Sequence, residues 1–238
     1  MTRAIVVVPT YNEAENLPAL VPEILAQDDR LEILVVDDGS PDGTGEIAEK
    51  IGEAESRVHV LHRSAKEGLG PAYRAGLARA LELGADIVIQ MDADFSHPPT
   101  SLPTLLEEIE THDVVLGSRY LNGITVVNWP IERILISWFG NVYARKISGL
   151  PISDTTGGFR CMRRELLEKM GFEHIRSNGY AFQIEMNYRF VKQKARIKEI
   201  PFFFVDRTRG VSKLNFRIGL EALWVVWWLR LADALGRL

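Results

Sequence analysis

The segment Ile87-Val-Ile-Gln-Met-Asp-Ala-Asp94 runs from an apolar stretch directly into two carboxylates. Ile87–Met91 is rich in β-branched residues, which is typical of a strand that is buried on both faces of a sheet. Asp92 and Asp94, one residue apart at the end of such a strand, can both reach a hard divalent cation through oxygen. Because Asp-x-Asp also occurs in turns and at helix caps, the spacing alone does not identify a site.

Apolar strands and helices alternate on both sides of this segment. The alternation predicts an α/β protein with a parallel sheet and helices on both of its faces. In such sheets, ligands bind beyond the carboxyl ends of the strands. The further strands are expected at Ala4–Val8, Leu31–Val36, Val58–His62 and Val114–Gly117, and the helices at Ala14–Gln27, Thr44–Glu55, Pro71–Leu83 and Leu102–Thr111.

Polar side chains gather just beyond these strand ends. A random arrangement would scatter them between both ends of the strands, so their gathering predicts one shared site at the carboxyl edge of the sheet. Asp37-Asp-Gly-Ser40 can be a simple turn, but Asp38 lies further into the loop and can accept hydrogen bonds from a ribose or a base. The gathered side chains are those of Tyr11, Glu13, Asp38, Asp92, Asp94 and Arg119.

The length and composition of the chain limit the classes of protein that it can be. Its 238 residues suffice for one α/β core, and 46% hydrophobic with 25% charged residues indicate a folded chain. The net charge of -4 gives no sign of nucleic-acid binding. The single cysteine, Cys161, excludes an intramolecular disulfide, and the apolar run Ala4–Val8 is too short for the core of a signal peptide.

The second half of the sequence is less regular. A helix expected at Ile131–Ser148 carries Arg133, Ser137 and Asn141 at four-residue spacing, and therefore on one face. No repeat or clear linker is visible, so we expect one domain over residues 1–214 and a helical extension over residues 215–238. The other expected elements are a turn at Asp154–Arg160, a helix at Ala181–Lys192, a strand at Ile197–Val205 and a basic loop at Asp206–Lys213.

Seven short motifs follow one another between residues 9 and 213. They are Pro9-Thr-Tyr-Asn-Glu13, Asp37-Asp-Gly-Ser-Pro-Asp-Gly-Thr44, Asp92-Ala-Asp-Phe-Ser-His-Pro98, Gly117-Ser-Arg-Tyr120, Asp154-Thr-Thr-Gly-Gly-Phe-Arg160, Phe182-Gln-Ile-Glu185 and Asp206-Arg-x-x-Gly-x-Ser-Lys213. In this order they resemble the dolichol-phosphate mannose synthases, which are inverting family 2 glycosyltransferases. The resemblance implies a GT-A Rossmann-like fold, with a mostly parallel central sheet flanked by helices. It also implies transfer of mannose from GDP-mannose to a polyprenyl (dolichyl-type) monophosphate, giving a β-linked product.

The resemblance further implies which residues bind the nucleotide sugar. It places Asp92, Ala93 and Asp94 at the diphosphate, with a divalent cation, Mg²⁺ or Mn²⁺, held by the two carboxylates. Many relatives carry Gln where this chain has Ser96, so a hydroxyl or a water would supply the third ligand here. The nucleoside would be surrounded by Pro9, Tyr11, Glu13, Val36 and Asp38.

Basic residues would bind the leaving and the attacking groups. By resemblance, Arg207 and Lys213 stabilise the departing GDP, and Arg207 joins Asp92 and Asp94 as a catalytic residue. The resemblance assigns the acceptor phosphate to Arg119, Arg133 and Ser137. Without the resemblance, Arg207 and Lys213 would be expected on a solvated loop, and Arg133 and Ser137 on an ordinary amphipathic helix.

No catalytic base is expected, because of the chemistry of the acceptor. A sugar hydroxyl needs a general base, whereas a phosphate monoester has its second pKa at about 6 and is mostly dianionic at neutral pH. Gln183 and Glu185 are expected to support the site, with a part in catalysis as the alternative, and Asp154 to shape its loop or to contact the sugar.

The C-terminal segment is apolar but too short to cross a membrane. Only 8 uncharged residues separate Glu221 from Arg230, whereas a span needs roughly 20. Its tryptophans suit a helix that lies in the headgroup region, joined there by Trp129–Val142. We expect peripheral attachment to the cytoplasmic face of a membrane, directly or through a membrane-anchoring partner. Packing on the domain core or in a dimer interface is the alternative.

Two other functions fit parts of the sequence, and a third is excluded. Polyprenyl-phosphate glucosyl- or aminoarabinosyltransferases that use a UDP-sugar share the early motifs, but they usually carry two C-terminal transmembrane helices. A catalytically silent sugar-nucleotide-binding subunit would be expected to lose Asp92, Asp94 or Arg207, and all three are present. A nicotinamide dehydrogenase is excluded because no Gly-x-Gly-x-x-Gly follows the first strand.

Overall fold

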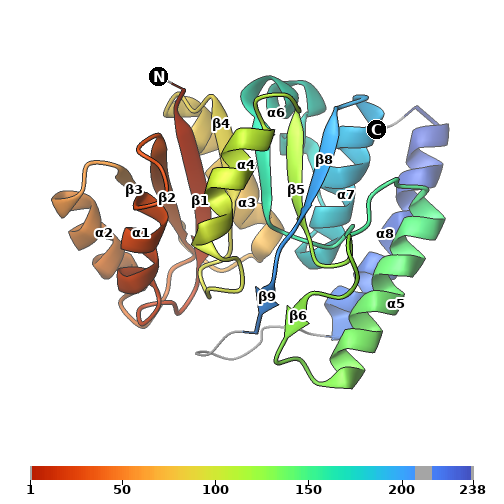
Figure 1. Cartoon of the computed structure of the whole chain (residues 1–238), viewed down its shortest axis with the longest axis horizontal. Helices are drawn as coiled ribbons and strands as arrows, with labels where there is room; N and C mark the ends of the chain where they lie inside the picture. Colours follow the sequence, from red (N-terminus) through yellow and green to blue (C-terminus); the bar gives the residue numbers. More distant parts are fainter. Residues whose placement is uncertain (1, 207–215, 237–238) are drawn as a thin grey trace.

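A seven-stranded sheet lies at the centre of the computed structural model, which describes residues 2–206 and 216–236 (Figure 1). Its strands run in the order β3-β2-β1-β4-β7-β5-β8. Neighbouring strands are parallel except in the two pairs that involve β7, so the predicted mostly parallel sheet is confirmed. The strands are β1 (Ala4–Thr10), β2 (Leu31–Asp37), β3 (Val58–His62), β4 (Ile87–Gln90), β5 (Val114–Ser118), β7 (Arg160–Arg163) and β8 (Ile197–Pro201).

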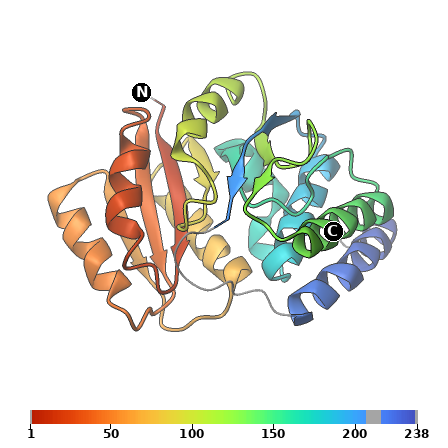
Figure 2. The same cartoon turned by 60° about the horizontal axis from the view of Figure 1, so that its bottom comes forward.

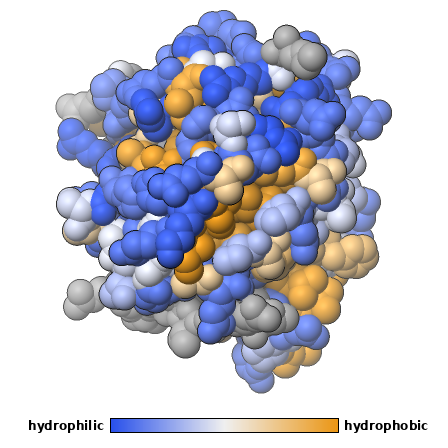
Figure 3. Space-filling view, turned by 90° about the vertical axis from the view of Figure 1, so that its left-hand side faces the viewer, coloured by the Kyte–Doolittle hydropathy of each residue, from blue (hydrophilic) through white to orange (hydrophobic). Residues whose placement is uncertain are grey.

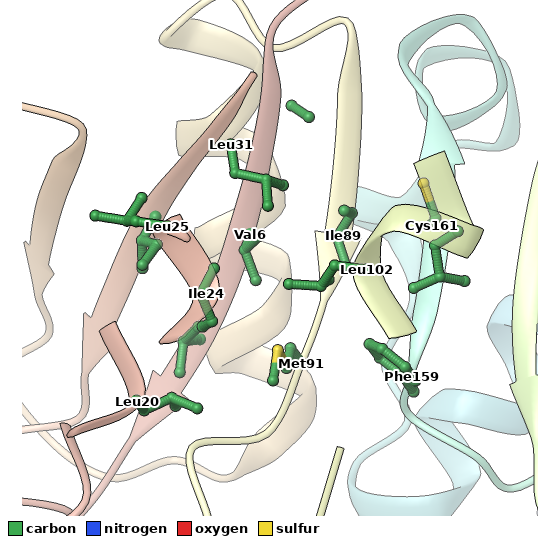
Figure 4. Packing of buried hydrophobic residues seen from close by; sticks show 14 of the residues in the cluster. Val6, Leu20, Ile24, Leu25, Leu31, Ile89, Met91, Leu102, Phe159 and Cys161 are labelled. Carbon is green, nitrogen blue, oxygen red and sulfur yellow. The ribbon is translucent and has the colours of Figure 1, made fainter. Parts of the chain in front are cut away.

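Helices cover both faces of the sheet (Figure 2). The side chains of β1 explain why, since they alternate between two cores and are all buried. Val6 packs with Ile24 and Leu102 on one face, where Figure 4 shows them converging, and Val7 packs with Tyr73 on the other. The first core is covered by α1 (Leu17–Leu25), α2 (Thr44–Ala54) and α4 (Leu102–Glu108), and the second by α3 (Leu69–Glu82), α6 (Arg164–Met170) and α7 (Gly179–Lys192).

Two segments of the sheet differ from the prediction, which was wrong for both. Arg160–Arg163, the end of the expected turn and the residues after it, forms the antiparallel strand β7 between β4 and β5. The single strand expected at Ile197–Val205 is divided into β8 and β9 (Phe204–Val205). β9 leaves the central sheet and pairs with β6 (Val126–Val127). Pro201 lies at the division, and a proline has no N–H to continue a ladder.

Apolar side chains also reach the surface on the side of the molecule formed by α1 and α2 (Figure 3). A groove on this side is lined by Val21 and Leu25 of α1 and by Ile47 and Ile51 of α2. Helices α1 and α2 lie at one end of the sheet, and α5 and α8 lie at the other (Figure 1). The groove is therefore remote from the helices that were expected at a membrane.

Two helices, α5 (Ile131–Ser148) and α8 (Phe216–Ala234), lie side by side at the opposite end of the sheet (Figures 1 and 2). Val226 and Leu229 of α8 are buried against α5 and α7, so the alternative of packing on the domain holds for this side of the helix. Trp224 and Trp227 are exposed on its other side. Among the residues that the structure describes, no helix has the length and apolar character that crossing a membrane requires.

Strand β7 brings an arginine into the core. Arg160 is fully buried and lies opposite Gln90 in the ladder between β7 and β4. Its Nη2 donates to the carbonyl of Gly157 at 2.6 Å, whereas Nε and Nη1 meet no hydrogen-bond partner in the described part of the chain. Burial lowers the pKa of Arg160 to about 10, so the side chain is still charged at neutral pH. Its guanidinium carbon lies 5.8 Å from the centroid of the Phe190 ring, and no ion pair is formed within the described residues, so the buried charge is only partly compensated and costs stability.

Replacing this charge should therefore stabilise the fold. We expect Arg160→Met to raise the free energy of unfolding by about 1 kcal/mol or more, because it removes a buried charge and keeps the length of the side chain. Urea denaturation at pH 7 measures the change. Arg79→Met is the control, since Arg79 makes an exposed ion pair with Glu82 and should contribute less than about 0.5 kcal/mol. A less stable Arg160→Met protein would contradict this account.

Candidate active site

A pocket of about 380 Å³ opens at the carboxyl edge of the sheet. Most of the residues expected there line it, and they come from the loops after β1, β2, β4 and β5 and from α5. Val36 and Ser137 are not among the lining residues: Val36 is buried in the core, and Ser137 contacts the hydroxyl of Tyr120 at 2.7 Å. Arg207 and Lys213 lie outside the described residues. The expected residues that line the pocket are Pro9, Tyr11, Glu13, Asp38, Asp92, Ala93, Asp94, Arg119 and Arg133.

The loop after β4 holds its two carboxylates in different ways. Asp92 Oδ1 accepts a hydrogen bond of 3.1 Å from the hydroxyl of Tyr73, and the main-chain N–H of Asp92 donates to His97 Nδ1 at 3.0 Å. Asp94 Oδ1 accepts from the main-chain N–H of Ser96 at 3.1 Å. Phe95, between Asp94 and Ser96, has a φ of 62°, a left-handed conformation that turns the loop back on itself. Both carboxylates line the pocket.

The oxygen atoms of this loop fit a hard divalent cation. In the described part of the chain, no group of three or more His, Cys, Asp or Glu side chains could hold a metal ion. Asp92 and Asp94 would therefore need a further ligand from the chain, water or a bound diphosphate. Ser96 Oγ is a suitable candidate, because it is buried beside the two carboxylates and has no hydrogen-bond partner among the described residues.

The other end of the pocket suits a nucleoside. The ring of Tyr11 lies there, with Lys66 Nζ 3.9 Å from its centroid. Asp38 lines the same end and pairs with Arg63. Desolvation raises the pKa of Asp38, and the guanidinium of Arg63 opposes this effect. Nothing in the sequence pointed to Lys66, which comes from the loop after β3.

The two acids that end β2 have different surroundings. Asp37 is almost fully buried and accepts hydrogen bonds from the main-chain N–H and the hydroxyl of Ser40, so it shapes the turn. Asp38 is the one of the two that lines the pocket.

Arg119 and Asp154 form a buried, two-pronged ion pair. Arg119 Nε and Nη2 lie 2.7 and 2.8 Å from the two oxygens of Asp154, and Nη2 also donates to Thr156 Oγ1 at 2.8 Å. Burial raises the pKa of Asp154, but the charge and hydrogen bonds of Arg119, together with the main-chain N–H of Thr156, lower it overall. Asp154 is therefore bonded to residues of its own loop and of the loop after β5, an arrangement that suits the first of its two predicted roles, which is to shape the loop. Arg119 lines the pocket but already gives most of its donors to Asp154 and Thr156.

Arg133 reaches the pocket from the first turn of α5. Its Nη1 lies 2.7 Å from Asp206 Oδ2, and its guanidinium carbon is 4.1 Å from the centroid of the Trp129 ring. Its Nε is buried without a hydrogen-bond partner among the described residues. A guanidinium on the pocket wall that is paired with Asp206 through one nitrogen can still donate hydrogen bonds to a second anion.

Helix α7 supplies support rather than reacting groups. Glu185 is fully buried, accepts from Ser177 Oγ and pairs with Arg189 at 3.0 Å, so it stabilises the packing of the helix. Gln183 lines the pocket, and its Oε1 has no hydrogen-bond partner within the described segments. A carboxylate that is already paired in the core is poorly placed to remove a proton from a substrate.

Two residues beside Asp92 were not singled out from the sequence. His97 is buried with its ring stacked 4.8 Å from that of Phe159, and burial lowers its pKa, which favours the neutral imidazole. Its signal was present, because it lies inside the third motif. Tyr73 gave no signal, since an aromatic residue in the middle of a helix is ordinarily a core residue.

Comparison with known proteins identifies the family. Residues 5–171 match the family described as Glycosyl transferase family 2. The chain is 44% identical over 221 residues to an undecaprenyl-phosphate mannosyltransferase of Micrococcus luteus, covering 93% of this chain and 91% of that protein. It is also 44% identical over 232 residues to a polyprenol monophosphomannose synthase of Mycolicibacterium smegmatis, covering 96% and 88%.

Solved structures share the fold at lower identity. A crystal structure of glucosyl-3-phosphoglycerate synthase from Mycobacterium tuberculosis with Mn²⁺, UDP-glucose and phosphoglyceric acid has a TM-score of 0.71 at 20% identity, covering 96% of this chain and 79% of that chain. The predicted GT-A Rossmann-like fold is thereby confirmed. Together with the two mannosyltransferase relatives, the fold and the matched residues show that the chain belongs to glycosyltransferase family 2.

Proposed function

We propose that this chain transfers mannose from GDP-mannose to a polyprenyl monophosphate, with inversion at the sugar carbon. The observation that carries the proposal is a single pocket in which Asp92 and Asp94 share the walls with Arg133. Such a pocket can bind a nucleotide diphosphate through a cation and a second phosphate through a guanidinium. The names of the two relatives at 44% identity support mannose as the sugar and a polyprenyl phosphate as the acceptor.

The nucleoside end of the pocket supports a guanine donor. Guanine presents two neighbouring N–H groups on one edge, and the two oxygens of Asp38 can accept from both. The ring of Tyr11 offers a flat surface for the base, and Glu13, two residues further along the same loop, also lines the pocket. The resemblance to dolichol-phosphate mannose synthases supports the same nucleotide.

A divalent cation, Mg²⁺ or Mn²⁺, would be held by Asp92 and Asp94. When bound, it would supply positive charge to the diphosphate and so assist the departure of GDP. Arg207 and Lys213 are proposed to assist at the same group. Ser96 Oγ is the side-chain oxygen of this loop that remains to complete the ligand set.

The acceptor phosphate is proposed to bind Arg133, with Arg119 and Ser137 close by. Its oxygen would form the new bond to C1 of mannose while the bond from C1 to the GDP oxygen breaks on the opposite face. No proton has to be removed from a dianionic phosphate, so no general base is needed. The buried ion pairs of Asp154 and Glu185 are consistent with this chemistry.

The outer sides of α5 and α8 are proposed to rest on the cytoplasmic face of a membrane. Large apolar side chains are exposed on both helices, which suits a surface that lies among headgroups. Arg133 is on α5 as well, so the pocket wall and this surface belong to the same helix. A membrane-anchoring partner protein could cover part of the same area. The exposed side chains are those of Ile131, Leu135, Ile136, Phe139, Trp224, Trp227 and Leu231.

The first test is transfer itself. Purified protein incubated with labelled GDP-mannose, a polyprenyl phosphate and Mg²⁺ or Mn²⁺ should move the label into an organic-extractable lipid, and labelled UDP-glucose should not replace the donor. Asp94→Ala should lower the rate by about 100-fold or more, because the cation contributes several kcal/mol to the barrier. Unchanged turnover by Asp94→Ala would refute the role of this carboxylate.

The second test separates the acceptor from the donor. Arg133→Ala should raise the KM for the polyprenyl phosphate by about tenfold or more, because a charge-assisted hydrogen bond is lost. The affinity for GDP-mannose, measured by calorimetry, should stay within about twofold of the wild-type value. Arg145→Ala, in the last turn of the same helix, is the matched control. Equal weakening of donor and acceptor would argue against the assignment.

The third test addresses the membrane. Replacing both Ile136 and Phe139 by Glu should lower binding to phosphatidylglycerol-containing vesicles by about tenfold or more, since each buried apolar side chain contributes about 1.5–3 kcal/mol. Co-sedimentation measures the bound fraction. The control is Ala19→Glu, because Ala19 is exposed on α1, at the other end of the sheet from α5. Equal binding by all three proteins would place the contact elsewhere.

A further inference from the structure

Tyr73 reaches from the protein core to one of the two acids of the pocket. It lies in the second turn of α3, and its side chain is fully buried. Its ring is stacked on that of Phe182, with centroids 6.0 Å apart and planes 8° from parallel. Its hydroxyl lies 3.1 Å from Asp92 Oδ1. The phenol is therefore fixed by packing at one end and by a carboxylate at the other.

The direction of this hydrogen bond follows from the two groups. An ionised carboxylate can only accept, so the hydroxyl of Tyr73 donates. The side chain of Asp92 is 37% exposed and lines the pocket, whereas Tyr73 does not line it. Tyr73 thus contacts Asp92 from behind and leaves the pocket side of the carboxylate open.

A second contact fixes the other side of the same residue. The main-chain N–H of Asp92 donates to His97 Nδ1, so the proton of the neutral imidazole is on Nε2. That Nε2 lies 3.9 Å from Asp92 Oδ2, too far for a direct hydrogen bond. His97 therefore holds the main chain of Asp92, and Tyr73 donates to its carboxylate.

We propose that Tyr73 is a positioning residue for the cation and diphosphate site. A carboxylate has about four lone-pair directions, and a donor fixed on one of them orients the others. With Oδ1 held by the buried phenol, the remaining directions of Asp92 face the pocket before any ligand arrives. This inference rests on the proposed role of Asp92 and Asp94 in holding a cation. Partners that orient a metal ligand in this way typically change metal affinity or activity by about 10–100-fold.

The variant Tyr73→Phe removes the hydroxyl and keeps the stacked ring. We expect it to weaken binding of Mn²⁺, measured by calorimetry or by electron paramagnetic resonance in the presence of GDP or UDP, by about 10–100-fold. In the transfer assay the KM for Mn²⁺ should rise by a similar factor, and kcat should approach the wild-type value at saturating Mn²⁺. A merely structural defect would not be restored by the metal.

A matched control is available in the same chain. The hydroxyl of Tyr188 donates to Asp233 Oδ2 at the same distance of 3.1 Å, where α7 meets α8 and away from the pocket. Tyr188→Phe loses the same kind of hydrogen bond and should bind Mn²⁺ like the wild type. Melting temperatures of the two variants show whether either has lost its fold.

Three results would overturn the inference. They are Mn²⁺ titrations of Tyr73→Phe that superimpose on those of the wild type, a loss of kcat that saturating Mn²⁺ does not restore, and a wild-type protein that takes up no Mn²⁺ with either nucleotide. Failure of the proposed function is distinguishable from all three. If the wild type bound Mn²⁺ with a nucleotide and Tyr73→Phe weakened this binding, the inference would stand even if no mannose reached a lipid.

Discussion

Parallel pairing of β1 with β2 and with β4 is the constraint on which the rest of the structure depends. Parallel strands need both faces covered, and the apolar side chains of β1 are buried in two separate cores. The same pairing brings the ends of three strands to one edge, so loops far apart in the sequence meet there. Asp38 and Asp92 therefore line one pocket, although they follow strands that are separated by β1.

Concentrating acids at one edge requires basic partners. Asp38 is paired with Arg63, Asp154 with Arg119 and Asp206 with Arg133, so each of these charges is held by an opposite one. Such pairs fix side chains in place more than they add stability, because desolvation offsets most of the attraction. The arrangement favours a site whose charges are set before a ligand binds.

The sequence was informative where one local pattern decides the outcome. Continuous apolar runs predicted β1, β2 and β4, and the position of Asp92 and Asp94 after a strand predicted where they lie. β7 was missed because its four residues have arginine at both ends and follow a glycine-rich turn, so its burial depends on neighbours far away in the chain. The contact of Tyr73 with Asp92 likewise arises from the packing of α3 under the loop after β4.

Helix α5 carries a guanidinium that faces the pocket and, three residues later, an apolar side chain that faces outward: Arg133 and Ile136. At 1.5 Å per residue, these positions differ by only about 4.5 Å along the helix axis. A lipid phosphate held by Arg133 would thus lie, along the helix, within one turn of a side chain that is proposed to rest on the membrane. Beyond its first few carbons, a polyprenyl tail would stay among other lipids, and its length would have little influence on recognition.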